Sequence, residues 1–303
     1  MKKVLLTGGS GFIGQQTIPF LLDRGFEVHA IFNSSEKKIF SQKNLYWHQC
    51  DLLNSAEQKK VFTLIKPSHL LNLAWYAVPG KYWESEENHK WLNAGIEIMK
   101  NFAEQGGIRA VFAGSSAEYD WSYGVCNEEN TPLKPSSTYG TCKKTLLEEL
   151  KRFSDQSGIG FAWGRVFLLY GPHEYSERLV ASFIYSLLKN KEAYCFNGKL
   201  IRDFLHVRDV ASAFISLLES NFNGAINIAS GNPAAIKDVV IMIGDILGKR
   251  KLINFTNNSA SVKEPEFLIA DVKLLNSEIG WFPEYTLDKG LTETIDWYKN
   301  NMN

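Results

Sequence analysis

This sequence lacks an excess of charge of one sign, long apolar runs and an N-terminus that looks like a signal peptide. Its 303 residues carry 33 Lys and Arg against 33 Asp and Glu, so the net charge is zero, and neither nucleic acid nor an anionic membrane is expected as the main partner. No apolar run approaches the roughly 20 residues that span a bilayer. Met1-Lys2-Lys3 leads directly into a short apolar segment and glycines, unlike a signal peptide. We expect a cytoplasmic protein whose partner is a small molecule.

Cysteine is scarce as well. The four cysteines are scattered, with no Cys-x-x-Cys motif and no pairing with histidine, which argues against a zinc site and against a disulfide scaffold. We therefore expect no bound metal and four reduced thiols. A chain of this length is long for one core and predicts a large domain with a smaller one appended. The cysteines are Cys50, Cys126, Cys142 and Cys195.

Three regularly spaced glycines follow the first apolar strand, at residues 4–6. Gly8, Gly11 and Gly14 allow the backbone to turn tightly, to approach a pyrophosphate and to pack a helix on a strand. The helix that follows is amphipathic and ends near Gly25, so its N-terminus would face the phosphates. A plain glycine turn is the alternative, but the strand before and the helix after favour dinucleotide binding.

A tyrosine and a lysine four residues apart, Tyr139 and Lys143, open a helix predicted over 139–149. Two prolines, Pro132 and Pro135, forbid a helix before it, and a Ser/Thr run supplies an N-cap. On a helix the two side chains share one face, so the ammonium can favour the ionised phenol and make a usable acid/base. The pair also fits an ordinary helix in which the tyrosine packs and the lysine is solvated.

Two longer motifs point to a family. Residues 7–14 have the pattern Thr-Gly-Gly-x-Gly-Phe-Ile-Gly, and residues 202–211 have Arg-Asp-Phe-x-x-Val-x-Asp-Val-Ala. Over essentially the whole chain the sequence resembles the extended short-chain dehydrogenases/reductases, NAD(P)-dependent sugar-nucleotide epimerases, dehydratases and reductases. The resemblance implies an α/β fold, a Rossmann-type doubly wound parallel sheet with a smaller C-terminal α/β substrate domain. Residues 1–172 would bind NAD(P), a segment near 200–230 would return to that domain, and 173–303 would mainly bind the sugar nucleotide.

The resemblance also implies roles for single residues. Ser115, four residues before Tyr119, matches the family serine that hydrogen-bonds the reacting oxygen, and would act with Tyr139 and Lys143; a helix N-cap is the alternative for Ser115. The cofactor would be bound by Gly8, Gly11, Phe12, Ile13 and Gly14 at the phosphates, Asn33, Ser34 and Lys37 at the adenosine ribose, Asp51 and Leu52 near the adenine, Leu73 and Ala74 along its length, and Tyr139 and Lys143 at the nicotinamide.

The cofactor type is indicated by the end of the second strand, at residues 27–32. A carboxylate there would bind the two ribose hydroxyls and repel a 2′-phosphate. This chain has Phe32-Asn33-Ser34-Ser35 instead, with Lys37 and Lys38 beyond. The missing acid favours NADP over NAD, without the arginine that usually accompanies NADP, and the lysines also fit a solvated loop.

Four large aromatic residues lie between Trp75 and Trp83, punctuated by Pro79-Gly80. A loop of this kind at the carboxyl end of a strand favours stacking on a sugar, with a core or dimer contact as the alternative. The resemblance adds Arg202 as the group that grips the nucleotide diphosphate, whereas Arg178 also fits an ordinary surface arginine. The predicted substrate-binding residues are therefore Trp75, Ser116, Arg178 and Arg202.

The residues after Ser115 limit which reaction of the resembled family this chain can catalyse. Sugar-nucleotide 4,6-dehydratases carry an acid/base pair there, whereas this chain has Ser116-Ala117, and Glu118 lies one place too far along. With NADP favoured, we predict NADPH-dependent reduction of a nucleotide-4-keto-6-deoxyhexose at C4. The alternatives are an NAD-dependent 4-epimerase of nucleotide sugars and a non-catalytic dinucleotide sensor, which would not need the serine, tyrosine and lysine.

Three further predictions concern structure. Helices predicted over 84–105 and from 139 would form a four-helix contact between two subunits, as in the resembled family, and so a homodimer. Asn197-Gly198 predicts a hairpin turn between two short strands. Residues 160–169 are predicted as a single strand.

Overall fold

The computed structural model describes residues 2–33, 40–256 and 265–302. Within these residues the largest element is a seven-stranded sheet in the order β12-β7-β5-β4-β1-β2-β3, and all its neighbouring strands are parallel. The strands are short apolar runs because helices bury the sheet on both faces. They are β1 (Lys3–Thr7), β2 (Glu27–Phe32), β3 (Leu45–Gln49), β4 (His69–Asn72), β5 (Arg109–Ser115), β7 (Gly160–Val166) and β12 (Gly224–Ile228).

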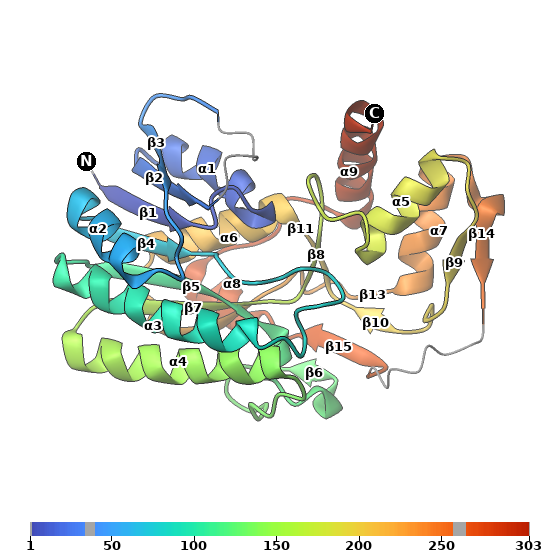
Figure 1. Cartoon of the computed structure of the whole chain (residues 1–303). Helices are drawn as coiled ribbons and strands as arrows, with labels where there is room; N and C mark the ends of the chain where they lie inside the picture. Colours follow the sequence, from blue (N-terminus) through green and yellow to red (C-terminus); the bar gives the residue numbers. More distant parts are fainter. Residues whose placement is uncertain (1, 34–39, 257–264, 303) are drawn as a thin grey trace.

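Helices cover the two faces of this sheet as separate layers (Figure 1). Each helix turns an apolar stripe inward; Ile98, Met99 and Phe102 of the third helix, for example, are at most 1% exposed. One face is covered by α1 (Phe12–Asp23), α6 (Val207–Glu219) and, beside β12, α8 (Lys273–Ile279). The opposite face is covered by α2 (Ser55–Ile65), α3 (Glu87–Glu104) and α4 (Thr138–Ser157).

A second core lies beyond the carboxyl ends of the sheet strands, on the right in Figure 1. Three helices close around fully buried side chains that include Ile184, Val239 and Leu291. The helices are α5 (Leu179–Leu188), α7 (Ile236–Ile246) and α9 (Leu287–Asn301). The remaining short strands of the chain are β6 (Val125–Cys126), β8 (Leu168–Tyr170), β9 (Ala193–Cys195), β10 (Ile201–Arg202), β11 (Phe204–His206), β13 (Ala234–Ala235), β14 (Ile253–Phe255) and β15 (Phe267–Ala270).

The predicted fold class, a doubly wound parallel sheet of the Rossmann type, is confirmed. β2 has the predicted bounds, whereas α3 begins three residues later than predicted, at Glu87. The single strand predicted over 160–169 is wrong. β7 ends at Val166, Phe167 donates its N–H to the carbonyl of Ile228 at 3.2 Å, and β8 then pairs with β11 in a separate sheet.

The predicted hairpin at Asn197-Gly198 is also wrong. A turn forms there, since the N–H of Leu200 donates to the carbonyl of Asn197 at 3.1 Å. The strands on its two sides nevertheless join different sheets, because β9 pairs with β14 and β10 pairs with β13 and β15. The Asn-Gly signal fixes the turn but not the partners of strands that are two or three residues long.

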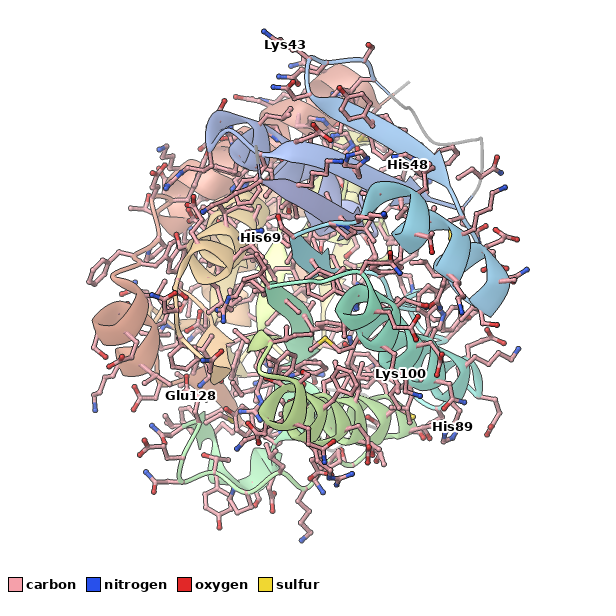
Figure 2. The ribbon with its side chains drawn as sticks, turned by 90° about the vertical axis from the view of Figure 1, so that its left-hand side faces the viewer. Lys43, His48, His69, His89, Lys100 and Glu128 are labelled. Atoms are coloured by element: carbon pink, nitrogen blue, oxygen red, sulfur yellow. The ribbon has the colours of Figure 1, made fainter. Side chains whose placement is uncertain are left out.

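The next observations concern membrane-spanning helices, metal ligands and cysteines. Within 2–33, 40–256 and 265–302, no helix combines the length and the apolar character that crossing a membrane requires. Over the same ranges, no group of three His, Cys, Asp or Glu side chains is placed to hold a metal ion. The four cysteines are free and buried. Figure 2 views the side of the molecule where the strands begin, with His69 at the start of β4.

Candidate active site

A cleft of about 1430 Å³ runs along the carboxyl ends of the sheet strands and into the second core. Its walls come from segments far apart in the chain, and they bring together most of the residues singled out in the sequence. The glycine-rich turn lines one part, and Ser115, Tyr139 and Lys143 line another. Arg178 and Arg202 belong to the wall that the second core contributes.

The glycine-rich turn presents backbone to this cleft. Gly11 donates its N–H to the carbonyl of Gly8 at 2.8 Å, and a Cβ on Gly14 would lie 2.1 Å from that same carbonyl oxygen. A side chain at residue 14 would therefore force the turn apart. Gly11 caps α1 without any side-chain hydrogen bond, so the first amides of α1 stay available to an anion. Phe12 and Ile13 line the cleft beside them.

The other predicted cofactor residues divide into three groups. Asn33, Leu52, Leu73 and Ala74 line the cleft. Asp51 instead closes a turn, its carboxylate accepting the N–H of Leu53 at 3.0 Å, and its neighbours Cys50 and Leu52 face the cleft. Ser34 and Lys37 lie outside the described residues.

The serine, tyrosine and lysine come together although they come from two elements. Ser115 ends β5, and Tyr139 and Lys143 lie one turn apart at the start of α4, where the Ser137 hydroxyl accepts the N–H of Gly140 at 3.1 Å and caps the helix. Gly140 lets α4 approach closely, since a Cβ there would lie 2.2 Å from the carbonyl oxygen of Ala117. Ser115 and Tyr139 line the same cleft, and the serine hydroxyl acts to lower the pKa of the tyrosine.

Burial dominates the electrostatics of this group. It raises the pKa of the Tyr139 phenol, against which the hydrogen bond from Ser115 and the charge of Arg178 act in the lowering direction. Burial also lowers the pKa of Lys143 to about 7, opposed by the negative charge of Glu118. The Lys143 Nζ lies 6.0 Å from the Tyr139 ring centroid. In this arrangement, the group that lowers the tyrosine pKa most is Ser115 rather than the lysine.

Glu118, for which no function was predicted from the sequence, is fully buried next to the trio. Its carboxylate accepts the N–H of Ser115 at 2.7 Å, the indole N–H of Trp163 at 3.0 Å and the Nε–H of Arg165 at 2.7 Å. Ser115 in turn caps the short helix 116–118, so it is both an N-cap, the alternative noted above, and a neighbour of Tyr139. Nothing in the sequence pairs residue 118, in the short helix after β5, with residue 165, near the end of β7.

The aromatic loop from Trp75 to Trp83 wraps around Tyr139. The rings of Tyr82, Trp83 and Trp75 lie edge-on to the tyrosine ring, with centroids 4.9, 5.8 and 6.2 Å away. The backbone joins them as well, because Tyr139 donates its N–H to the carbonyl of Trp83 at 2.9 Å. Sequence reasoning missed Trp121, which lines the cleft and donates its indole N–H to the carbonyl of Ser116 at 2.8 Å.

The two arginines predicted at the substrate occupy different settings. Arg178 donates to the hydroxyl of Tyr82 and to the carbonyl of Ala77, both at 3.5 Å, so it is tied to the aromatic loop. Arg202 is 5% exposed, donates to the carbonyls of Ile201 and Glu266 at 2.9 and 3.3 Å, and lines the cleft. Ser116 lines the cleft as well.

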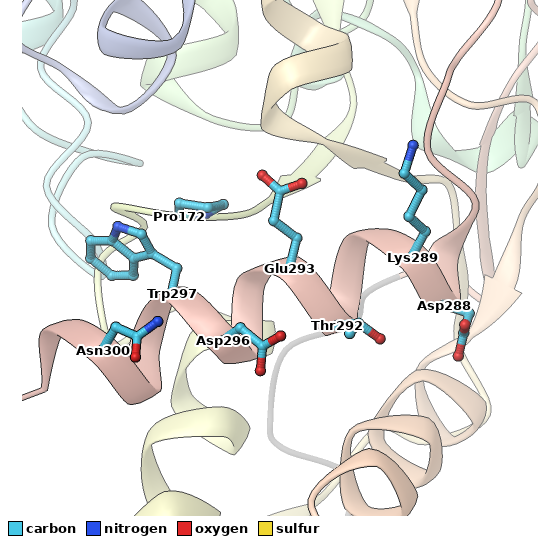
Figure 3. Close-up of a pocket in the computed structure, with 8 residues that line it drawn as sticks. All are labelled: Pro172, Asp288, Lys289, Thr292, Glu293, Asp296, Trp297 and Asn300. Carbon is cyan, nitrogen blue, oxygen red and sulfur yellow. The ribbon is translucent and has the colours of Figure 1, made fainter.

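A second, shallower cavity of about 650 Å³ lies along α9. Figure 3 shows its residues, with Lys289, Glu293 and Trp297 on one side of the helix. Glu293 accepts the hydroxyl of Tyr285 at 2.6 Å and pairs with Arg208 at 3.5 Å. Trp297 borders both cavities, so this hollow adjoins the main cleft.

Comparisons with known proteins agree with this geometry. Residues 4–229 match the model of the NAD dependent epimerase/dehydratase family. The UDP-glucuronate 4-epimerase of Thermodesulfobacterium geofontis is 26% identical over 321 residues, which cover 98% of this chain and 96% of that protein. The UDP-N-acetylglucosamine 4-epimerase of Methanobrevibacter ruminantium, solved with UDP-N-acetylmuramic acid, has a TM-score of 0.89 at 26% identity over 99% of each chain. The Thermus thermophilus UDP-glucose 4-epimerase, solved with NAD, has a TM-score of 0.88 at 24% identity over 99% of each chain.

Proposed function

The chain belongs to the NAD dependent epimerase/dehydratase family, and from this premise we propose that it reduces a nucleotide-4-keto-6-deoxyhexose at C4 with NADPH. The observation that carries the proposal is that Ser115, Tyr139 and Lys143 line the same cleft as the open amides of the glycine-rich turn. A proton carrier beside a dinucleotide site fits the interconversion of a ketone and an alcohol.

The three residues of the trio have different tasks in this reaction. A nicotinamide bound in this cleft would supply the hydride for C4. Ser115 donates a hydrogen bond to the carbonyl oxygen and polarises it, and Tyr139 passes its proton to that oxygen as the alcohol forms. Lys143 would hold the nicotinamide ribose and, when charged, would favour the tyrosinate left behind. The glycine-rich turn would hold the pyrophosphate, since its backbone leaves no room for a side chain at residue 14.

Two observations support reduction over the other reactions of the family. Dehydration would need an acid/base pair at Ser116-Ala117, and the nearby Glu118 is held by Arg165. Asn33 lines the cleft where a carboxylate would select NAD. The 4-epimerase stays the second candidate because relatives of this chain are named 4-epimerases.

The test is an assay with purified protein. We expect stoichiometric consumption of NADPH with a nucleotide-4-keto-6-deoxyhexose, and loss of turnover by more than tenfold in Tyr139→Phe, which keeps the ring and removes the proton carrier. Tightly bound NAD that survives purification, with interconversion of UDP-sugars and no net absorbance change of the nicotinamide, would establish the epimerase instead.

We also propose that the protein is a homodimer through α3 and α4. The two helices pack side by side on one face of the sheet, and the face turned outward carries polar side chains such as His89 and Lys100 (Figure 2). Light scattering at micromolar concentration should give twice the 34.3 kDa of one chain. A monomeric mass would contradict the proposal.

A further inference from the structure

The ammonium of Lys143 is surrounded by aromatic rings. The residue is 3% exposed, and its Nζ donates a hydrogen bond to the carbonyl of Ala113 at 2.8 Å. The same nitrogen lies 3.8 Å from the centroid of the Trp75 ring, 5.8 Å from that of Trp163 and 6.0 Å from that of Tyr139. Trp75 is thus the ring in closest contact with the charge.

A buried ammonium needs compensation to stay charged. Removal from water lowers the pKa of Lys143 to about 7, and Glu118, the carboxylate whose charge opposes this shift, is already engaged by Arg165. The negative face of an aromatic ring stabilises a cation within about 6 Å, most strongly for tryptophan and in a desolvated site. At 3.8 Å, the Trp75 ring supplies this stabilisation directly at Nζ.

The Trp75 ring is itself held in place. Its indole N–H donates to Oδ1 of Asn88 at 2.9 Å, and Asn88 is fully buried. The Asn88 amide in turn donates to the carbonyls of Tyr82 and Ser85 at 2.7 and 2.9 Å. The amide therefore fixes both the orientation of the indole and the end of the aromatic loop, so the ring face stays turned to the ammonium.

We propose that Trp75 is a positioning residue that holds the Lys143 ammonium in its charged form beside Tyr139. The inference rests on the proposed function, in which the charged lysine assists the tyrosine. It gives Trp75 a role different from sugar stacking, because the ring face nearest the trio is occupied by the lysine. Asn88 acts one step further away by orienting the indole.

The direct test is the pKa of Lys143, measured by NMR on protein labelled with ¹³C-lysine, with the resonance assigned by its loss in Lys143→Met. Trp75→Leu removes the π-system while keeping an apolar filling, and should lower this pKa by about one unit or more. Trp75→Phe keeps a weaker ring and should give a smaller decrease. Trp83→Leu is the matched control, since Trp83 packs edge-on against Tyr139 and should leave the lysine unchanged.

A second measurement covers the case in which Trp75→Leu does not fold. Replacing the eight tryptophans by fluorinated tryptophan withdraws electron density from the rings with almost no change in shape. The pKa of Lys143 should then fall in the otherwise unaltered protein and fall less in the Trp75→Phe background, where Trp163, 5.8 Å from Nζ, still responds. The proposal would be overturned if fluorination left the Lys143 pKa unchanged or raised it in the otherwise unaltered protein. It would also be overturned if the pKa fell equally in that protein and in Trp75→Phe.

The pH profile of kcat/KM connects the measurement to catalysis. Lys143 must be protonated to act, so a lower pKa moves the high-pH decrease of kcat/KM to lower pH. In Trp75→Leu this decrease should shift by as much as the pKa shifts in the NMR titration. In Trp83→Leu it should not shift. Absence of turnover with every nucleotide-4-keto sugar would count against the proposed function alone, because the NMR titration needs no turnover.

Discussion

Removing the charge of Glu118 should destabilise the fold more than any surface change. Its carboxylate has no exposed area and accepts hydrogen bonds from Ser115, Trp163 and Arg165. Glu118→Gln keeps the shape but leaves the guanidinium of Arg165, whose side chain is 3% exposed, without a counter-charge. It also turns an amide NH₂ toward groups that are themselves donors.

The magnitude follows from the burial of the pair. Breaking a buried ion pair by removing one partner costs about 3–5 kcal/mol, because the remaining charge stays out of water. This is a large part of the roughly 5–15 kcal/mol that keeps a typical domain folded. Replacing both partners, in Glu118→Leu with Arg165→Met, removes the unpaired charge and should recover most of the loss.

Urea unfolding measures these differences. The matched control is Glu149→Gln on α4, whose exposed pair with Arg152 at 3.0 Å contributes about 0–1 kcal/mol. We expect a marked decrease in the midpoint for Glu118→Gln, a small one for Glu149→Gln, and partial recovery in the double variant. Equal effects of the two single substitutions would refute the reasoning.

Three further predictions follow from single contacts. Gly14→Ala should abolish dinucleotide binding measured by calorimetry, because its Cβ would lie 2.1 Å from the carbonyl oxygen of Gly8; retained affinity would contradict the assigned turn. Asn33→Asp should shift the preference from NADPH towards NADH by at least about tenfold in kcat/KM, because a carboxylate repels the 2′-phosphate; an unchanged ratio would place the ribose elsewhere. Burial lowers the pKa of His69 and of His206 from 6.5 to about 4. As the pH falls, both histidines therefore take up protons in the unfolded chain before they do so in the folded one. Each histidine should lower the free energy of unfolding by about 2 kcal/mol between pH 7 and pH 5. In urea unfolding, His206→Leu should remove about half of this pH dependence of the free energy of unfolding. If the variant and the unaltered protein showed the same pH dependence, His206 would be excluded as a source of it.

Local patterns account for what could be predicted from the sequence. The glycine spacing at 8, 11 and 14 requires a strand, a tight turn and a helix in succession, and the structure has them in that order. Ser115 and Tyr139 meet because a strand end and the first turn of a following helix share the same edge of a parallel sheet. Such predictions depend on a few adjacent residues and on rules of handedness and layering.

Contacts between distant segments could not be predicted in this way. Glu118 and Arg165 are 47 residues apart, and neither belongs to a pattern that names the other. The strands around Asn197-Gly198 are so short that the turn between them does not decide their partners. Trp75 could be assigned to the cleft from its loop, but the face it turns to Lys143 depends on Asn88, which lies on the next helix.

The arrangement around Glu118 also bears on the reaction. A dehydratase needs an acid and a base that are free to exchange protons with the substrate. The Glu118 carboxylate accepts the N–H of Ser115, and a proton placed on it would leave Arg165 without its partner in a buried site. In the reaction that we propose, Tyr139 is the group that passes a proton to the oxygen at C4. Reduction of a ketone needs one proton carrier at the oxygen, whereas removal of water across C5 and C6 needs an acid and a base beside those carbons. Ser116-Ala117 supplies neither, so these residues favour a product that keeps the substituents at C5 and C6.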